Sequence, residues 1–542
     1  MIFDKRDLKF ERLGYMVDCS RGAVPKVETV QKLINYLAEF GYTFLELYTE
    51  DTYEIPGEPY FGYMRGRYTA AEIAEIDSYA KSKGIELIPC IQTLAHLERI
   101  KKYTCYNGLF EIDNILNVDE DGTYELIEKM LIAVGKMFSS NRVHIGMDEA
   151  MLLGRGKLLD KYGKQSREDI MYRHLAKVAE IAEKLGMECE MWSDMLVTEG
   201  HEPQPETSAL VPYEARRVPD NVHPVMWTYW KKTDAELDAF ITKNKALGRK
   251  TTFAGGAHKW EGFAPNNGYG NEVTEHQIAK CLQHGVEGYM TTGWADGAAD
   301  ASQFSILPTL YYTAVLAHGK KLDGHYKNKF ASVVGTPYDS FMTVDRLNRP
   351  ENKFYKDLST QSFVYFYSDV LQGIADSIVQ PDAKFIYTNL SDSIRKAKCG
   401  KDMRYFFATY KAFADFVAEK STLGKKLYEA YISKEADSMK AVIKRLDSAI
   451  KLLDEFIEVY TEMWHTENKP FGFEKQQLRL GGLKLRLEYT RDKVKKFCQG
   501  KINRIEELET EHLAIGWMDE NVNCDNVCCN DFNNLFSGGG LM

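Results

Sequence analysis

Residues 166–194 read SREDIMYRHLAKVAEIAEKLGMECEMWSD and contain the unit from which the fold is built. Apolar residues recur with helical spacing from Ser166 to Leu185, a glycine follows at position 186, and a β-rich apolar run covers Met187–Trp192. Glycine readily adopts the left-handed conformation that closes a helix, so a helix ending in glycine just before a strand is typical of alternating helices and parallel strands. We therefore predict a helix, a short loop and a strand in this stretch.

The same unit recurs along the chain from residue 13 to about residue 320. Helical patterns at residues 27–40, 70–83, 234–247 and 274–284 end in the same way, at glycines 41, 84, 248 and 285. The predicted strands are Leu13–Asp18, Thr43–Tyr48, Ile85–Ile91, Arg142–Met147, Met187–Trp192, Val222–Thr228, Lys250–Gly255 and Val286–Thr292. Eight such units over roughly 300 residues close into a (β/α)8 barrel, or TIM barrel, whose functional residues lie at the carboxyl ends of the strands.

The sequence changes character after about residue 325. Segments rich in Lys, Glu, Leu and Ala, with few Gly or Pro, predict helices at Thr360–Ile378, Asp402–Lys420, Ser438–Trp464 and Phe473–Phe497. We therefore expect an α/β protein with two domains, a (β/α)8 barrel at residues 1–325 and an all-α C-terminal domain at residues 326–542. The last ten or so residues, ending in Gly538–Gly540, are expected to be disordered.

Composition limits the partners and the compartment. A net charge of -10 disfavours nucleic acid and anionic membranes, because both bind clustered Lys and Arg. No apolar run is long enough to span a bilayer, and the first ten residues lack the apolar core of a signal peptide, so we expect a cytoplasmic protein. Ten scattered cysteines are expected to be reduced thiols. Cys524, Cys528 and Cys529 are a weak metal candidate without a CxxC pair, so neither a metal nor a cofactor is predicted.

Polar and aromatic residues gather where the predicted strands end. In chain order they are Asp18, Arg21, Glu50, Asp51, Gln92, His96, His144, Asp148, Glu149, Trp192, Asp194, Trp227, Tyr229, Trp230, His258, Trp260, Trp294 and Asp296. Five of the seven tryptophans belong to this set. Sugars present apolar C–H faces and hydroxyls, which match ring faces flanked by charged groups. This pattern favours a sugar site over simple packing of the tryptophans.

The run HIGMDE at residues 144–149 places two carboxylates side by side. Neighbouring carboxylates in a partly dry pocket repel each other, so one pKa is expected to rise until that group can donate a proton near neutral pH. Successive strand residues point to opposite faces, so Asp148 and Glu149 can serve one site only if the strand ends there. The alternative is an ordinary solvated surface pair.

These residues together resemble glycoside hydrolase family 20. The resemblance rests on HxGxDE at the end of strand four, Arg21 after strand one, His96 after strand three, and Trp294 and Asp296 after strand eight. It covers roughly residues 10 to 320 and is closest to the bacterial N-acetylglucosaminidases with an α-helical C-terminal domain. Two departures stand out. The α/β domain that commonly precedes the family's barrel is not expected here, and the family's Asp-Asp after strand two is Glu50-Asp51.

The resemblance implies a retaining exo-β-N-acetylhexosaminidase that acts by substrate-assisted catalysis. In this reaction the substrate's 2-acetamido group attacks C1 and forms an oxazolinium ion. Glu149 is then the general acid and base, and Asp148 holds the acetamido N–H. Tyr229 is the candidate ligand of the acetamido oxygen, although the family's tyrosine usually lies one strand later.

The resemblance also implies substrate-binding residues. Arg21 and Asp296 bind O3, O4 or O6 of the terminal sugar, and His96 with Glu50 or Asp51 orients Glu149. The alternative for His96 is a purely structural histidine. The expected walls around the acetamido methyl group are Trp192, Trp227 and Trp294.

Two other functions remain open at this stage. One is a retaining β-glycosidase with an enzymic carboxylate nucleophile, and the other is a catalytically silent sugar-binding barrel. In each case the partner is a small glycan, with a terminal N-acetylhexosamine in the favoured case. The helical C-terminal domain is compatible with a homodimer.

Overall fold

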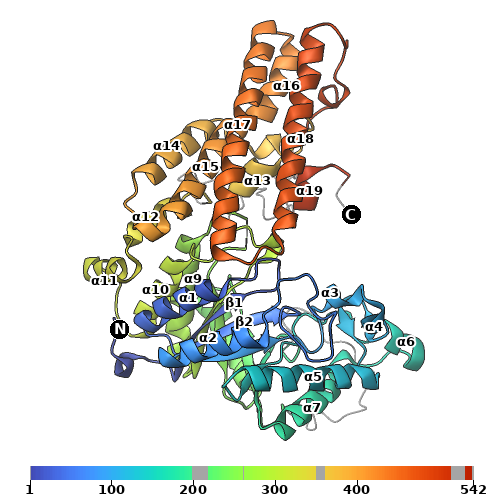
Figure 1. The fold of residues 1–542 in the computed structure, drawn as a ribbon, viewed down its shortest axis with the longest axis vertical. Coiled ribbons are helices and arrows are strands. Elements are labelled where there is room, and N and C mark those ends of the chain that lie inside the picture. Colours follow the sequence, from blue (N-terminus) through green and yellow to red (C-terminus); the bar gives the residue numbers. More distant parts are fainter. Residues whose placement is uncertain (1, 198–217, 261, 349–360, 514–531, 540–542) are drawn as a thin grey trace. The chain divides into compact units, whose positions relative to one another are not determined.

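The computed structural model describes residues 2–197, 218–260, 262–348, 361–513 and 532–539, which form two compact units. The first unit comprises Met1–Ala257, Gly270–Trp294 and Leu310–Leu322, and the second comprises His258–Tyr269, Ala295–Thr309 and Asp323–Met542. The first unit holds the barrel, and the second is mainly helical (Figure 1). The domain boundary expected between residues 325 and 326 stays a prediction.

Eight parallel strands close the barrel of the first unit. They are β1 (Arg12–Asp18), β2 (Phe44–Glu50), β3 (Glu86–Ile91), β6 (Arg142–His144), β7 (Glu188–Trp192), β8 (Val222–Trp227), β9 (Thr252–Gly256) and β10 (Gly288–Gly293). Each strand pairs with the next in this order, and β10 pairs with β1. The (β/α)8 fold and its eight predicted strands are confirmed. The carboxyl ends of all the strands therefore open at one mouth.

The barrel helices begin and end near the predicted signals. Helix α1 (Val27–Phe40) ends at Gly41, which has a φ of 83°. Helix α7 (Arg167–Lys184) starts after Ser166, whose side chain accepts a hydrogen bond from the backbone N–H of Asp169. Glycines 84, 186, 248 and 285 also have positive φ, as helix closure requires. The other long helices of this region are α2 (Ala70–Ser82), α5 (Asp121–Met137), α8 (Asp234–Lys245), α9 (Asn267–Gln283) and α10 (Leu307–Ala317).

Two local features of the barrel differ from the sequence expectation. Strand β6 ends three residues early, because Gly146 and Met147 have φ values of 72° and 70°, which a β-strand does not accommodate. A short hairpin of β4 (Phe110–Ile112) and β5 (Ile115–Leu116), which was not predicted, lies in the connection after β3. The early end of β6 turns the chain just before the two neighbouring carboxylates.

The second unit is built from helices. They are α11 (Gly324–Val334), α12 (Tyr338–Asp345), α13 (Gln361–Tyr367), α14 (Ala383–Lys396), α15 (Arg404–Lys420), α16 (Leu423–Ser433), α17 (Ala436–Glu467), α18 (Phe473–Cys498) and α19 (Phe532–Phe536). Three of the helices predicted for the C-terminal domain correspond to α15, α17 and α18, so the predicted helical C-terminal region is confirmed.

Two expectations for this region were wrong. Residues 360–378 do not form one helix, since α13 ends at Tyr367 and the chain turns at Gly373, which has a φ of 59°. The tail expected to be disordered includes α19, where the Phe532 ring lies 4.9 Å from that of Tyr367. The cysteines at 524, 528 and 529 lie outside the described residues.

Two segments that follow β9 and β10 in the chain belong to the helical unit. The ring of Phe263 packs against the rings of Phe413 and Phe456, and its carbonyl oxygen accepts a hydrogen bond from the Tyr410 hydroxyl at 2.8 Å. At the end of α17, the buried Glu467 carboxylate accepts a hydrogen bond from the Ser302 hydroxyl at 2.5 Å. The helical unit therefore has its own core, to which these two segments contribute side chains.

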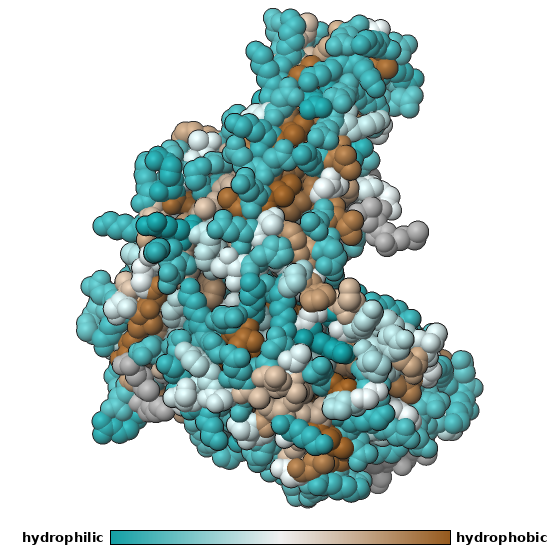
Figure 2. Space-filling view, viewed as in Figure 1, coloured by the Kyte–Doolittle hydropathy of each residue, from teal (hydrophilic) through white to brown (hydrophobic). Residues whose placement is uncertain are grey.

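The face of the molecule in Figure 2 is largely hydrophilic, with apolar residues in small groups. Within the part of the chain that the structure describes, no helix combines the length and apolar character needed to cross a bilayer.

Replacing Gly14 of β1 is expected to destabilise the barrel. A Cβ atom at Gly14 would lie 2.0 Å from the ring of Phe44 on β2, which is 1% exposed and cannot move aside. We predict that Gly14→Ala lowers the free energy of unfolding by about 1 to 3 kcal/mol, as overpacking in a core usually does. Urea denaturation measures the effect. Gly108→Ala is the control, because nothing lies within 4 Å of the new Cβ there; equal losses in both variants would contradict the prediction.

Candidate active site

The loop after β6 directs the two neighbouring carboxylates to one imidazole. Met147 and Glu149 have φ values of 70° and 53°, so the alternation of a strand is lost there. His96 Nε2 lies 3.2 Å from Asp148 Oδ2 and 3.6 Å from Glu149 Oε2. The side chain of Asp148 is 10% exposed, and that of Glu149 is 51% exposed. One carboxylate is therefore shielded from water while its neighbour is open to it.

The side-chain amide of Gln92, just after β3, holds the buried carboxylate. Its Nε2 donates to Asp148 Oδ1 at 2.7 Å and to the Tyr48 hydroxyl oxygen at 2.9 Å. Its Oε1 accepts the backbone N–H of Met147 at 3.2 Å. Residue 146 must be glycine, because a Cβ atom there would lie 2.1 Å from Gln92 Oε1. This buried amide therefore fixes both the loop and the carboxylate that the loop carries.

Arg21 and Glu50 extend the network to the ends of β1 and β2. The Tyr48 hydroxyl donates to Glu50 Oε1 at 3.2 Å, and Arg21 Nε lies 3.4 Å from the same oxygen. The Arg21 guanidinium also lies 5.8 Å from the centre of the Trp294 ring. Burial raises the pKa of Glu50 to about 7, although the charge of Arg21 opposes the rise.

The next residue, Asp51, pairs with a different arginine. Arg65 donates to Asp51 Oδ1 through Nε at 3.2 Å and through Nη2 at 3.1 Å, and it also donates to the carbonyl oxygen of Ser20. The sequence left open whether Glu50 or Asp51 acts with His96 to orient Glu149. Glu50 is the one in contact with Arg21 and Tyr48.

His96 and Asp148 form a charged pair. Burial acts to lower the pKa of His96, but the charge of Asp148 and the hydrogen bond to it raise this pKa to about 9. Burial acts to raise the pKa of Asp148, yet His96 and then Gln92 hold it below its usual value. We expected one of the two neighbouring carboxylates to have a raised pKa; Asp148 is not that one, because the nearby His96 cation holds its pKa down. An imidazolium and a carboxylate therefore face each other at neutral pH.

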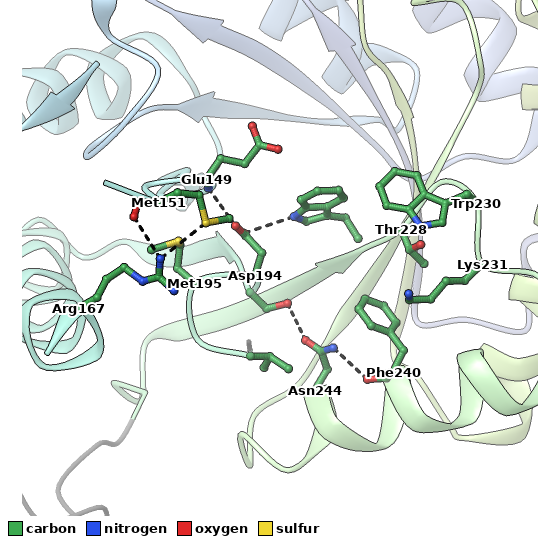
Figure 3. A pocket seen from close by; sticks show the side chains of 13 residues that line it. Glu149, Met151, Arg167, Asp194, Met195, Thr228, Trp230, Lys231, Phe240 and Asn244 are labelled. Carbon is green, nitrogen blue, oxygen red and sulfur yellow. Dashed lines mark hydrogen bonds between the residues drawn. The ribbon is translucent and has the colours of Figure 1, made fainter. Parts of the chain in front are cut away.

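Asp194, two residues after β7, is a carboxylate with a raised pKa. Its Oδ2 accepts the backbone N–H of Glu149 at 2.9 Å, and its Oδ1 accepts Trp227 Nε1–H at 3.3 Å (Figure 3). Burial, followed by the charge of Asp148, raises the pKa of Asp194 to about 7 despite these hydrogen bonds. Asp194 thus ties the left-handed backbone of Glu149 to an indole from the end of β8.

Aromatic rings from β7, β8 and β10 form a cluster in the same unit. Trp294 Nε1 donates to the Tyr229 hydroxyl oxygen at 2.6 Å, and the Trp227 ring stacks on that of Tyr229 with 5.3 Å between centres. The Trp192 ring lies 5.9 Å from that of Trp294. Trp192 and Trp294 are buried, whereas Trp230 is 51% exposed. The cluster therefore offers an apolar wall with one open edge.

A cavity lies beside Glu149, and its lining does not include Asp148, Tyr229, Trp192 or Trp294. Its lining includes Glu149, Asp194, Trp227 and Trp230. In Figure 3, Asp194 lies between Glu149 and Met151 on one side and Trp230 on the other. Charged and apolar surfaces thus meet at one place, as a sugar requires.

The contacts described so far do not include four residues of the predicted set. Asp296 belongs to the second unit, where it begins the short helix η3 (Asp296–Ala298), so its sugar-binding role stays a prediction. His258 and Trp260 belong to the same unit, with ring centres 4.4 Å apart. His144 is buried below the loop, where its Nδ1 accepts the backbone N–H of Gly146 at 3.1 Å.

Two groups of described residues have donor atoms close enough to share a cation. They are His96, Asp148 and Glu149 at the mouth, and Glu46, Cys90 and His144 inside the barrel, with donor atoms within 4.8 Å of one another in each group. A metal ligand needs a neutral imidazole, so a cation at the first group would have to displace the proton that the raised pKa of His96 favours. That the site holds no metal stays a prediction from the sequence.

Sequence reasoning assigned no role to Tyr48, Gln92 or Asp194. All three stand at or just after the end of a strand, and that position was the available signal. Their residue types did not suggest a role, because each acts through hydrogen bonds to residues on other strands.

Fold and site together define a class, the (β/α)8 barrels that carry a carbohydrate site at the carboxyl ends of their strands. Residues 10–237 match the family described as "Glycosyl hydrolase family 20, catalytic domain", and residues 339–525 match the one described as "Glycoside Hydrolase 20C C-terminal domain". Together the two matches span most of the chain. The chain belongs to glycoside hydrolase family 20, which confirms the resemblance.

The curated relatives that the chain resembles include proteins named hexosaminidases. The chain is 26% identical to Homo sapiens Hexosaminidase D over 294 residues, which are 51% of this chain and 58% of the relative. It is 25% identical to Bos taurus Hexosaminidase D over 354 residues, 60% of this chain and 96% of the relative. Among solved structures, Flavobacterium johnsoniae chitobiase has a TM-score of 0.46 and 15% identity, covering 93% of this chain and 74% of that one.

The His96–Asp148 pair predicts a specific loss of stability at alkaline pH. The folded-state pKa of His96 is raised from 6.5 to about 9, so its contribution is fully present below pH 6.5 and is lost as the pH rises through 9. We expect the urea midpoint of the wild type to fall between pH 7 and pH 9.5. In the His96→Gln variant, the part of this fall in the urea midpoint that is due to His96 should be absent. Parallel curves for the two proteins would contradict the assigned pair.

Proposed function

We propose that this chain is a retaining exo-β-N-acetylhexosaminidase that hydrolyses terminal non-reducing β-linked GlcNAc or GalNAc by substrate-assisted catalysis. One observation carries the proposal: a single imidazole faces a buried carboxylate at 3.2 Å and a half-exposed carboxylate at 3.6 Å. Two carboxylates with such different environments suit two different roles. The names of the curated relatives support the same activity.

In this scheme the substrate supplies the nucleophile. The carbonyl oxygen of its 2-acetamido group attacks C1, the bond between C1 and the leaving oxygen breaks, and an oxazolinium ion forms. Because the attack is intramolecular, correct positioning of the acetamido group can lower the barrier by about 7 to 11 kcal/mol. The chain's part is therefore to position that group, stabilise its charge and move protons.

Asp148 is suited to stabilising the acetamido group. Its lowered pKa keeps it ionised, so it can accept the acetamido N–H and stabilise the positive charge that develops there. Gln92 and His96 approach different oxygens of this carboxylate and so fix its plane. Tyr229, whose hydroxyl oxygen accepts a hydrogen bond from Trp294, is our candidate ligand of the acetamido oxygen.

Glu149 is suited to proton transfer, because its side chain is half exposed while Asp194 holds its backbone. It protonates the leaving oxygen as the bond to C1 breaks, and then takes a proton from the water that attacks C1 and opens the ring. Two displacements at C1 restore the β-configuration. The released N-acetylhexosamine is therefore a β-anomer, and neither a metal nor a cofactor enters the scheme.

The remaining assignments concern the terminal sugar. Arg21 has a partly exposed guanidinium that Glu50 holds, and we assign it to O3, O4 or O6 of the sugar, with Asp296 as a second ligand. Trp192, Trp227 and Trp294 are assigned to the walls around the acetamido methyl group. Recognition of these hydroxyls restricts cleavage to chain ends.

Substrate selectivity tests the source of the nucleophile. We expect kcat/KM for the p-nitrophenyl β-N-acetylglucosaminide to exceed that for the matching β-glucoside by about a thousandfold or more, because the glucoside lacks the attacking group. A thiazoline that mimics the oxazolinium ion should inhibit competitively, and EDTA should have no effect. Equal rates on both glycosides would favour an enzymic nucleophile. Binding of GlcNAc without any hydrolysis would favour a silent sugar-binding barrel.

Substitution of the two carboxylates tests their separate roles. We expect Glu149→Gln to lower kcat on the p-nitrophenyl substrate by about 10² to 10⁴, with a smaller loss on a dinitrophenyl substrate, whose leaving group needs less protonation. Asp148→Asn should lower kcat by about 10² to 10³ on both substrates. Glu188→Gln is the control, because Glu188 begins β7 at the opposite end of the barrel. Near wild-type activity of Asp148→Asn would remove that residue from the scheme.

A further inference from the structure

Three tyrosines form an exposed cluster in the first unit, outside the cavity described above. Tyr60 is 48% exposed and Tyr63 is 50% exposed, and the half-buried Tyr103 lies beside both. The ring centres of Tyr60 and Tyr103 lie 5.1 Å apart in a stacked arrangement, and Tyr63 lies 6.1 Å from Tyr60 and 6.3 Å from Tyr103. Large apolar side chains gathered this openly usually mark a binding surface. We call these three residues the tyrosine platform.

Hydrogen bonds hold the loop that carries Tyr60 and Tyr63. Arg67 donates to the carbonyl oxygens of Pro59 and Phe61, on both sides of Tyr60. A Cβ atom at Gly62, which has a φ of 65°, would lie 2.1 Å from the carbonyl oxygen of Asp51, so this position requires glycine. The rings are thus presented in fixed positions, and little conformational entropy is lost when a ligand binds.

The platform belongs to the same mouth as the active site. Tyr60 and Tyr63 lie in the connection that follows β2, and Tyr103 lies between the short helices α3 (Glu98–Lys101) and α4 (Thr104–Asn107) after β3. In a (β/α)8 barrel, both connections lie at the carboxyl ends of the strands. Arg65, close to Tyr63 in the chain, donates hydrogen bonds to Asp51 and to the carbonyl oxygen of Ser20. Asp51 directly follows Glu50, and Ser20 directly precedes Arg21, which are both proposed site residues.

The chemistry around the rings fits a sugar. Lys102 Nζ lies 5.1 Å from the centre of the Tyr103 ring. Glu58, two residues before Tyr60, accepts hydrogen bonds from Lys129 at 2.7 Å and from the Tyr106 hydroxyl at 2.8 Å. Pyranose rings combine apolar faces with a rim of hydroxyls, so they need ring faces bordered by such charged groups. Three rings are too small an area for a stable protein interface, which buries about 1,200 Å² or more.

We propose that the tyrosine platform binds pyranose rings of the leaving part of the glycan, beyond the sugar that contacts the scissile bond. This inference rests on the proposed function and deepens it, since it names an oligosaccharide as the substrate class. On this proposal an aryl N-acetylglucosaminide occupies the active site without contacting the platform. A longer glycan reaches both and gains affinity from stacking.

Chain-length kinetics test the platform. Chito-oligosaccharides of two to five GlcNAc units are compared with the p-nitrophenyl monosaccharide, using the full chain. For the wild type, KM should fall once the oligosaccharide is long enough to reach the tyrosines. The double variant Tyr60→Ala, Tyr63→Ala should reduce the ratio of kcat/KM for the pentamer to kcat/KM for the monosaccharide by about tenfold, mostly through KM. Replacing both residues by Trp should restore the ratio, because the ring faces return.

Tyr489→Ala removes a tyrosine of equal exposure from α18 and should leave the ratio unchanged. A length-independent KM, or an unchanged ratio in the double variant, overturns the platform while leaving the proposed function intact. If the wild type hydrolyses none of the substrates, the proposed function is wrong. In that case, equal affinity of wild type and double variant for the pentamer by calorimetry overturns the platform as well.

Discussion

The buried amide of Gln92 is the contact on which the geometry of the site depends. Its oxygen accepts the N–H of Met147, and its nitrogen donates both to Asp148 and to Tyr48, which in turn donates to Glu50. One side chain therefore sets the relative positions of the ends of β2, β3 and β6. The absence of a Cβ atom at Gly146 is what allows this amide to approach the loop. A carboxylate held on both oxygens cannot rotate, so its charge is oriented before any ligand arrives.

Backbone strain is concentrated at the same strand ends. Glu50, His96 and Glu149 all have positive φ, at 46°, 58° and 53°, although none is glycine. Such conformations cost of order 1 to 3 kcal/mol each and persist only where the surroundings over-determine them. Here the surroundings are identifiable: Asp194 holds the N–H of Glu149, and Asp148 pairs with His96. The barrel thus offsets local strain in order to aim three polar side chains at one place.

The fold could be predicted from the sequence because its signals are local. Apolar periodicity and glycine closure act within one helix and strand, as at Gly41 and Gly186, so they can be read without knowing the partners. The same reasoning failed for residues 360–378, where the turn at Gly373 interrupts a helical composition. The convergence of Asp148, Glu149 and His96 could also be anticipated, since a barrel gathers all its strand ends at one mouth.

The electrostatics of the site could not be predicted in this way, because they depend on distances across strands. Adjacency in the chain suggested that Asp148 and Glu149 would set each other's pKa. In the folded barrel burial acts to raise the pKa of Asp148, but the cation of His96, from the connection after β3, and the hydrogen bonds to this carboxylate together lower it. The carboxylate whose pKa rises to about 7 beside this pair is instead Asp194, which lies 46 residues beyond Asp148 in the sequence but is buried near its charge. Pairs of carboxylates with diverging pKa values are therefore to be sought across the mouth of a barrel rather than along its sequence.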